Sequence, residues 1–186
     1  GSLFISMQKG VSRGIFSNEA GLGTGSIAHA CADTRKPVKQ GMFGIFEVFA
    51  DTIVICTLTA MVILCSGVPV GYGSAAGAEL TISGFTATYG GWSSIFTAVA
   101  LCSFAFSTII GWYFFGEQNV KYLFGVKAVK VYACIAVVCV ALGAVLEAPL
   151  VWNLSDLFNA LMVFPNLLAL LALSGVVAGI ARNKKD

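Results

Sequence analysis

The sequence predicts an all-α integral membrane protein with about five membrane-spanning helices, the first of which is broken in the middle. Of its 186 residues, 58% are apolar and 11% are charged, and the mean hydropathy is +0.88. Soluble domains carry about 25% charged residues. The net charge of +2 is far too small for a nucleic-acid footprint, so nucleic-acid binding is excluded.

Several apolar stretches are long enough to cross a bilayer, which takes about 20 helical residues. Trp92 to Phe115 and Leu157 to Ile180 contain no charged residue. Val48 to Cys65 carries one acidic residue, Asp51, and Val131 to Leu146 carries none. We therefore expect a single transmembrane domain over residues 1–186, with spans at about 3–33 (broken), 41–66, 91–116, 123–147 and 156–181.

The first predicted span is irregular. An apolar start at Leu3 to Met7 leads into charged and polar residues mixed with glycines, and then into a helical stretch from Ser26 to Ala32. Polar groups and helix-breaking glycines survive at membrane depth where they line a protein or water cavity. The pattern therefore predicts a helix that is interrupted in its middle.

The basic residues predict the orientation. Nine of the eleven lie in stretches 33–40, 117–130 and 182–186, whereas 67–90 and 147–156 contain no Lys or Arg. By the positive-inside rule the first set, with the C-terminus, is cytoplasmic. The first helix then enters from outside, so we expect an odd number of helices upstream. The stretch Gly67 to Gly90 is predicted as an external linker, with a short lid as the alternative.

The stretch Gly14 to Gly25 is the candidate binding segment. A broken helix offers N–H groups at the start of its second half and carbonyls at the end of its first, a combination that suits a zwitterion. Ser17, Asn18 and Thr24 can add side-chain hydrogen bonds. A re-entrant turn or a glycine-packed helix contact is the alternative, and a dinucleotide loop is excluded because no strand precedes the glycines.

The sequence gives little support for a catalytic site or a metal site. The one histidine, His29, is badly placed as a base for Ser17, and a hydrogen-bonded interior histidine is the favoured interpretation. The six cysteines form no CxxC pair and are interpreted as small buried hydrophobes. A zinc site is therefore not expected.

Three acidic residues are candidates for interacting with ions. Glu47 and Asp51 stand four residues apart on one predicted helix face, where they could coordinate a cation, relay a proton, or pair with Lys9 or Arg13. Glu19 could either bind an ion or organise the break by accepting backbone N–H bonds.

Ser107 and Thr108 place two hydroxyls side by side near the middle of the third span. Hydroxyl oxygens are hard ligands that can replace the water shell of sodium. They can equally bond back to carbonyls of their own helix, so both interpretations stay open.

The residues also resemble a known family. The run Arg13-Gly-Ile-Phe-Ser-Asn-Glu-Ala-Gly-Leu-Gly23, with Pro37 to Gly41, Phe49 to Ile53 and Phe106 to Tyr113, closely resembles the sodium:alanine symporter family over nearly the whole chain. Members resemble LeuT-type transporters, built of two inverted five-helix repeats that each begin with a broken helix. The resemblance implies that this chain is the second repeat and that a five-helix N-terminal half is its partner.

The resemblance implies sodium-coupled transport of alanine, and of glycine as a further substrate, by a multi-pass protein of the plasma or inner membrane that contacts the lipid bilayer. The residues expected to line the substrate are Phe16, Ser17, Asn18, Glu19, Ala20, Gly21, Gly23 and Thr24. Ser107 and Thr108, together with Phe104, are the expected sodium ligands, and Glu47 and Asp51 are candidates for ion coupling. The rival interpretations are a structural membrane subunit and a membrane-embedded enzyme.

Overall fold

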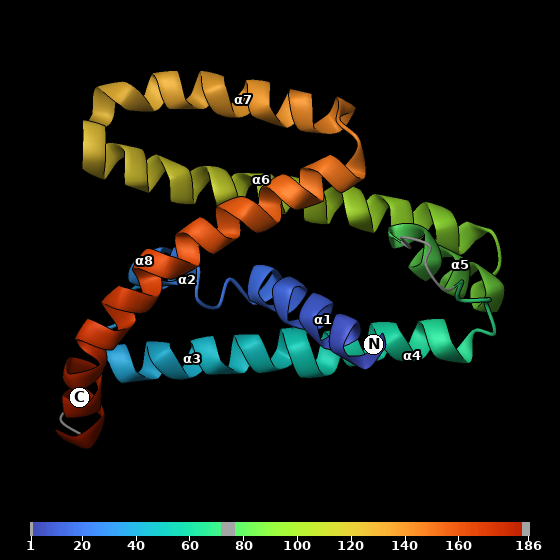
Figure 1. Cartoon of the computed structure of the whole chain (residues 1–186), viewed down its shortest axis with the longest axis horizontal. Helices are drawn as coiled ribbons and strands as arrows, with labels where there is room; N and C mark the ends of the chain where they lie inside the picture. The colour runs from blue at the N-terminus through green and yellow to red at the C-terminus, as the bar shows by residue number, and fades with distance from the viewer. Residues whose placement is uncertain (1, 72–76, 184–186) are drawn as a thin grey trace. The chain divides into compact units, whose positions relative to one another are not determined.

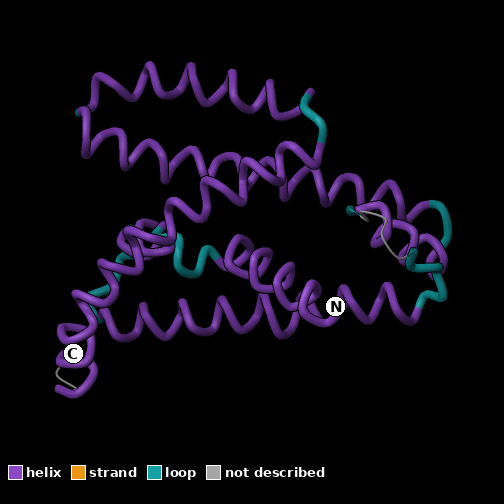
Figure 2. The backbone as a smooth tube through the Cα atoms, viewed as in Figure 1, coloured by secondary structure: helices purple, strands orange, loops and turns teal. Residues whose placement is uncertain are grey.

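The computed structural model describes residues 2–71 and 77–183, and within these ranges the regular structure is helical, with no strand (Figures 1 and 2). This confirms the predicted all-α class. Lys184 and Lys185, which contribute to the predicted orientation, lie outside the described residues.

The first predicted span is interrupted as expected. α1 (Ser2–Asn18) and α2 (Thr24–Ala30) are separated by five residues in which the helix stops and restarts. Glu19, Gly21 and Gly23 have φ angles of 51°, 92° and 88°. These left-handed conformations cannot continue a right-handed helix, which is why α1 ends at Asn18.

Within the described residues, four helical segments are long and apolar enough to cross a membrane, namely Pro37–Cys65, Trp92–Phe124, Val126–Val145 and Ala148–Arg182. The first joins α3 (Pro37–Phe49), a π-helical stretch η1 (Ala50–Ile55) and α4 (Cys56–Cys65). The second is α6 (Trp92–Phe124), the third joins a 3₁₀ turn η2 (Val126–Ala128) to α7 (Val129–Val145), and the fourth is α8 (Ala148–Asn183).

Two helices extend beyond the predicted spans. α6 continues to Phe124 through a charged turn in which Lys121 Nζ lies 2.6 Å from Glu117 Oε1, so the two charges compensate each other. α8 begins at Ala148, and Pro149 fits its first turn because no intrahelical acceptor is available to an N–H there. Asp156, the first residue of the predicted span, therefore lies two turns inside the helix.

The predicted external linker contains a helix. α5 (Ala78–Tyr89) packs against α4, and residues 72–76 of the same stretch lie outside the described residues. Gly84 is buried in this contact, and a Cβ there would make ordinary van der Waals contacts, 3.4 Å from Ser66 Oγ and 3.5 Å from the Val62 carbonyl oxygen. Because this helix is rich in small residues, its composition looked like that of a linker.

The chain forms two compact units, one made of residues 1–49 and 113–186 and the other of residues 50–112. In the first unit, α7 packs on the last turns of α6, where the Tyr132 ring stacks on Tyr113 with centroids 5.4 Å apart. Gly116 leaves the space that the Tyr132 hydroxyl occupies. In the second unit, α5 packs on α4, and Ser93 of α6 donates a hydrogen bond to Gly90 O at 2.7 Å.

Apolar side chains are exposed along every predicted span. Among the described residues, the buried apolar side chains are Leu22 and Phe115. Apolar surface of this extent is typical of a protein covered by lipid or by other protein. Leu22 lies in the break between α1 and α2, so the break is among the best-enclosed parts of the chain.

Candidate functional site at the break between α1 and α2

The break is a tight turn closed by its own backbone. Glu19 N donates to Phe16 O at 3.3 Å, and Leu22 N donates to Glu19 O at 3.2 Å. Glu19 takes the left-handed conformation without being glycine, which costs about 1–2 kcal/mol. The surrounding contacts must therefore stabilise the turn.

The turn removes backbone groups from the helical hydrogen-bond ladder. The last carbonyls of an α-helix have no partner within it, nor do the first N–H groups. Gly23, the N-cap of α2, has no side chain to satisfy these N–H groups, and the Ser26 hydroxyl donates to Gly23 O at 2.6 Å. Polar backbone is thus concentrated between Asn18 and Thr24, where a ligand could bind it.

Asn166 on α8 binds this backbone directly. Its Nδ2 donates to Gly21 O at 2.9 Å. Its Oδ1 lies so close to Gly23 that a Cβ there would be 3.1 Å away. Two features therefore favour glycine at position 23, namely its left-handed φ angle and the close approach of the Asn166 side chain.

The break also encloses polar side chains. Thr24 is 3% exposed and Leu22 is 4% exposed. The Thr24 hydroxyl makes no well-formed hydrogen bond among the described residues, although the Glu19 carboxyl group interacts with it. Buried oxygens of this kind are suited to contacting a polar ligand.

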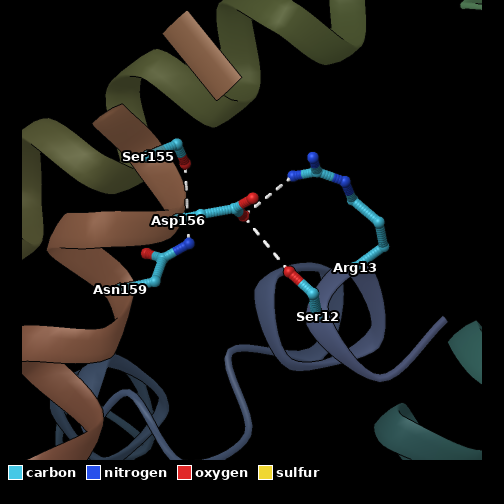
Figure 3. A network of polar contacts seen from close by, with 5 residues as sticks. All are labelled: Ser12, Arg13, Ser155, Asp156 and Asn159. Carbon is cyan, nitrogen blue, oxygen red and sulfur yellow. Dashed lines mark hydrogen bonds and ion pairs between the residues drawn. The ribbon is translucent and has the colours of Figure 1, made fainter. Parts of the chain in front are cut away.

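A second polar attachment joins α1 to α8, one turn and a half before the break (Figure 3). Arg13 Nη1 and Ser12 Oγ each donate to Asp156 Oδ1 at 3.2 Å. The Arg13 and Asp156 side chains are 35% and 34% exposed, so the pair is partly withdrawn from solvent. Asn159 Nδ2 lies 3.5 Å from Ser155 Oγ beside it.

Trp152 of α8 completes this attachment. The Arg13 guanidinium carbon lies 4.0 Å from the centroid of the indole ring, which is cation–π geometry. Phe16 meets the same indole edge-on, with centroids 6.1 Å apart. Phe16, an expected substrate residue, is therefore held on α8 through Trp152.

His29 connects α2 to α3 and is hydrogen-bonded as predicted. Gln40 Nε2 lies 2.8 Å from His29 Nδ1, and His29 Nε2 lies 3.6 Å from Glu47 Oε2. An amide donor at Nδ1 places the ring proton of the neutral imidazole on Nε2, toward Glu47. Gly44 permits this approach, since a Cβ there would lie 3.2 Å from His29 Nε2.

The predicted substrate residues follow one another through the break. Phe16, Ser17 and Asn18 end α1, Thr24 begins α2, and the others lie between them. Of the two predicted ion-coupling residues, Glu47 lies on α3, with a side chain that is 73% exposed and close enough to the break to interact electrostatically with Glu19, and Asp51 lies in η1. Arg13, one of their expected partners, pairs with Asp156.

The predicted sodium ligands lie on α6. Phe104, Ser107 and Thr108 belong to the unit formed by residues 50–112, and their side chains are exposed in this chain. Their role as ligands stays a prediction.

The residues that the sequence reasoning missed lie on α8. Trp152, Asp156, Asn159 and Asn166 follow one another at intervals of four, three and seven residues, which places them on one helix face. This spacing was a usable signal. Asp156 stood at the first residue of the predicted span, Trp152 lay before that span, and the two asparagines lay in a run that contains no charged residue.

Within the described residues, four helical segments of membrane-spanning length and an interrupted, polar helix are the features of a multi-pass helical membrane protein. The family model of the sodium:alanine symporter family matches residues 1–185. The chain belongs to this family, whose matched relatives are named as transporters and symporters.

Three relatives illustrate the match. An uncharacterized transporter of Haemophilus influenzae is 42% identical over 174 residues, which is 92% of this chain and 38% of the relative. The sodium/alanine symporter AgcS of Methanococcus maripaludis is 43% identical over 172 residues, 90% of this chain and 37% of the relative. The probable sodium/glutamine symporter GlnT of Bacillus subtilis is 43% identical over 178 residues, 95% and 37% of the two chains. The chain thus spans less than two fifths of the length of these relatives.

Replacing Gly23 by alanine should destabilise the protein more than replacing Gly21. Both positions have left-handed φ, so each alanine costs about 1–2 kcal/mol of strain. At Gly21 no atom lies within 4 Å of a new Cβ, whereas at Gly23 the Asn166 amide must also move. We expect a lower Tm in detergent for Gly23→Ala than for Gly21→Ala, and removing Asn166 in the Gly23→Ala background should recover part of the difference. Equal Tm values for the two alanine variants would contradict the close approach.

Arg13 and Asp156 should be energetically coupled. In a double-mutant cycle of Arg13→Ala and Asp156→Ala, we expect a coupling free energy of about 1 kcal/mol, because the pair is only partly desolvated. Thermal unfolding in detergent at low and high salt measures it, and the coupling should fall as salt rises. Additive effects of the two single substitutions would show that the contact contributes no stability.

Proposed function

We propose that this chain forms part of a sodium-coupled symporter for small neutral amino acids such as alanine and glycine, and that the break between α1 and α2 supplies half of its substrate site. The observation that carries the proposal is the concentration of polar backbone and small residues between Asn18 and Thr24. Membership of the sodium:alanine symporter family supports it, as do the names of two relatives, a sodium/alanine symporter and a probable sodium/glutamine symporter.

The polar groups of the break match the ammonium and carboxylate groups that all amino acids share. Carbonyls at the end of α1 can accept hydrogen bonds from an ammonium group. Ser17, Asn18 and Thr24 offer side-chain groups for a carboxylate or an ammonium. Ala20, Gly21 and Gly23 have little bulk, so a ligand can approach the main chain. Alanine and glutamine differ only in their side chains. A site that binds the α-ammonium and α-carboxylate groups therefore suits both.

The remainder of the site would come from outside this chain. In the LeuT-type arrangement that we propose, the chain is the second five-helix repeat, and a broken helix of the first repeat completes both the substrate and the sodium sites. Rocking of one bundle against the other would then expose the site to each side in turn. Sodium binding would favour the outward-open form that receives the amino acid.

The sodium ion is assigned to α6 in this proposal. Ser107 and Thr108 would contribute hydroxyl oxygens, and Phe104 lies one turn earlier on the same helix. One sodium ion moving down a potential of 100 mV releases about 2.3 kcal/mol, enough for roughly 50-fold accumulation of a neutral substrate. Glu47 and Asp51 are further candidates for coupling.

The proposal places the protein in the plasma or inner membrane with its C-terminus in the cytoplasm. Nine of its eleven basic residues support this orientation, because they fall in stretches that alternate along the chain with stretches free of Lys and Arg.

Uptake of labelled alanine into proteoliposomes tests the proposed function. The protein would be compared as this chain alone and joined to the N-terminal region of its family, with and without an inward sodium gradient. We expect gradient-driven accumulation of chemically unchanged alanine by the joined protein. Absence of sodium-dependent uptake of alanine, glycine and glutamine would contradict the proposal and favour a structural role.

The sodium ligands can be tested separately. We expect Ser107→Ala with Thr108→Ala to raise the sodium concentration for half-maximal uptake by about thirtyfold, since two charge–dipole contacts of about 1 kcal/mol each are lost. Ser103→Ala is the matched control, because its hydroxyl donates to Val99 O at 3.0 Å within its own helix. An unchanged sodium dependence in the double variant would remove both residues from the ion site.

A further inference from the structure

The break contains three left-handed residues within five, and its backbone is bound by one side chain from a distant helix. Asn166 lies 145 positions from Gly21 in the sequence, yet its Nδ2 donates to Gly21 O at 2.9 Å. The same amide places its oxygen against Gly23, where a Cβ would be 3.1 Å from Oδ1 and 3.3 Å from Cγ. One carboxamide therefore contacts both glycines of the turn.

The turn needs such a contact. A carbonyl that leaves the helical ladder at membrane depth has little water to bind, and a buried unsatisfied polar group is costly. Asn166 satisfies the Gly21 carbonyl without adding a charge. Since Gly21 is free to adopt many conformations, a hydrogen bond to its carbonyl fixes the peptide plane that follows it.

We propose that Asn166 is a positioning residue for substrate binding: its amide holds the Gly21–Gly23 turn in the conformation that presents the backbone of the break to the amino acid. This inference rests on the proposed function, and it adds a residue of α8 that acts on the substrate only through the turn. The asparagine supplies both a donor and an oxygen, so neither an apolar residue nor a carboxylate can replace it.

Substitutions at Asn166 distinguish the positioning role from a role in packing alone. Asn166→Ala removes the contact, and Asn166→Asp keeps the shape but turns a second acceptor toward the Gly21 carbonyl oxygen. Asn153 is the matched control, since it is an exposed asparagine on the same helix. Asn153→Ala and Asn153→Asp test the general effect of each change on α8.

Uptake kinetics in the joined, full-length protein give the first readout. Loss of one hydrogen bond predicts a KM for alanine that rises about three- to tenfold in both Asn166 variants. The maximal rate per folded transporter and the sodium concentration for half-maximal uptake should stay within about twofold, and both Asn153 variants should match the wild type. A residue that served folding alone would lower the amount of folded protein and leave KM unchanged, a result that would overturn the proposal.

Hydrogen exchange gives a second readout that needs no substrate. We expect amides of residues 19–25 to exchange several-fold faster in Asn166→Ala than in the wild type or in Asn153→Ala. The turn should open locally more often when its hydrogen bond to Asn166 is removed. Unchanged exchange would overturn the positioning role even if transport were impaired. If the wild type showed no sodium-driven uptake, the proposed function would fail, while the exchange experiment would still decide whether Asn166 holds the turn.

Discussion

A backbone group that leaves the hydrogen-bond ladder of a helix needs another partner, and this constraint accounts for the contact between the break and α8. Helices satisfy it internally, but the turn between Asn18 and Thr24 does not. The chain meets the requirement at Gly21 by bringing an asparagine from α8 to the free carbonyl. A polar and conformationally strained turn can persist because another helix stabilises it.

The two polar attachments to α8 work together. Asp156 and Asn166 are ten residues apart, about 15 Å along a helix, and they hold Arg13 before the break and Gly21 within it. Trp152 adds contacts to Arg13 and Phe16. A motion that separated this part of the chain from α8 would disrupt the Arg13–Asp156 ion pair, two further hydrogen bonds and the two contacts to Trp152. In the proposed transport cycle, the second half of α1 and this face of α8 should therefore move as one body.

Much of this could be predicted from local sequence. Long apolar runs with little or no charge predicted the four apolar spans, and the glycines and polar residues of 14–25 predicted the interruption, because each signal depends on neighbouring residues. The partner of the break could not be found in this way. Asn166 and Gly21 are 145 positions apart in the sequence, and the start of α8 at Ala148 placed Trp152, which lay before the predicted span, on the same helix as Asp156. α5 was missed because its small residues suit close packing on α4 as well as they suit a linker.

We propose that the break between α1 and α2 contacts the substrate. The most direct test is whether the substrate protects a cysteine placed in the break from a thiol reagent. Ala20 is exposed and lies between two left-handed residues, so Ala20→Cys would be made with the six native cysteines replaced. Its reaction with a membrane-impermeant thiol reagent would be followed in the reconstituted full-length protein. The account predicts that alanine and sodium together slow the reaction several-fold, and that sodium with a non-transported solute does not. The same reaction rate with and without alanine would contradict it.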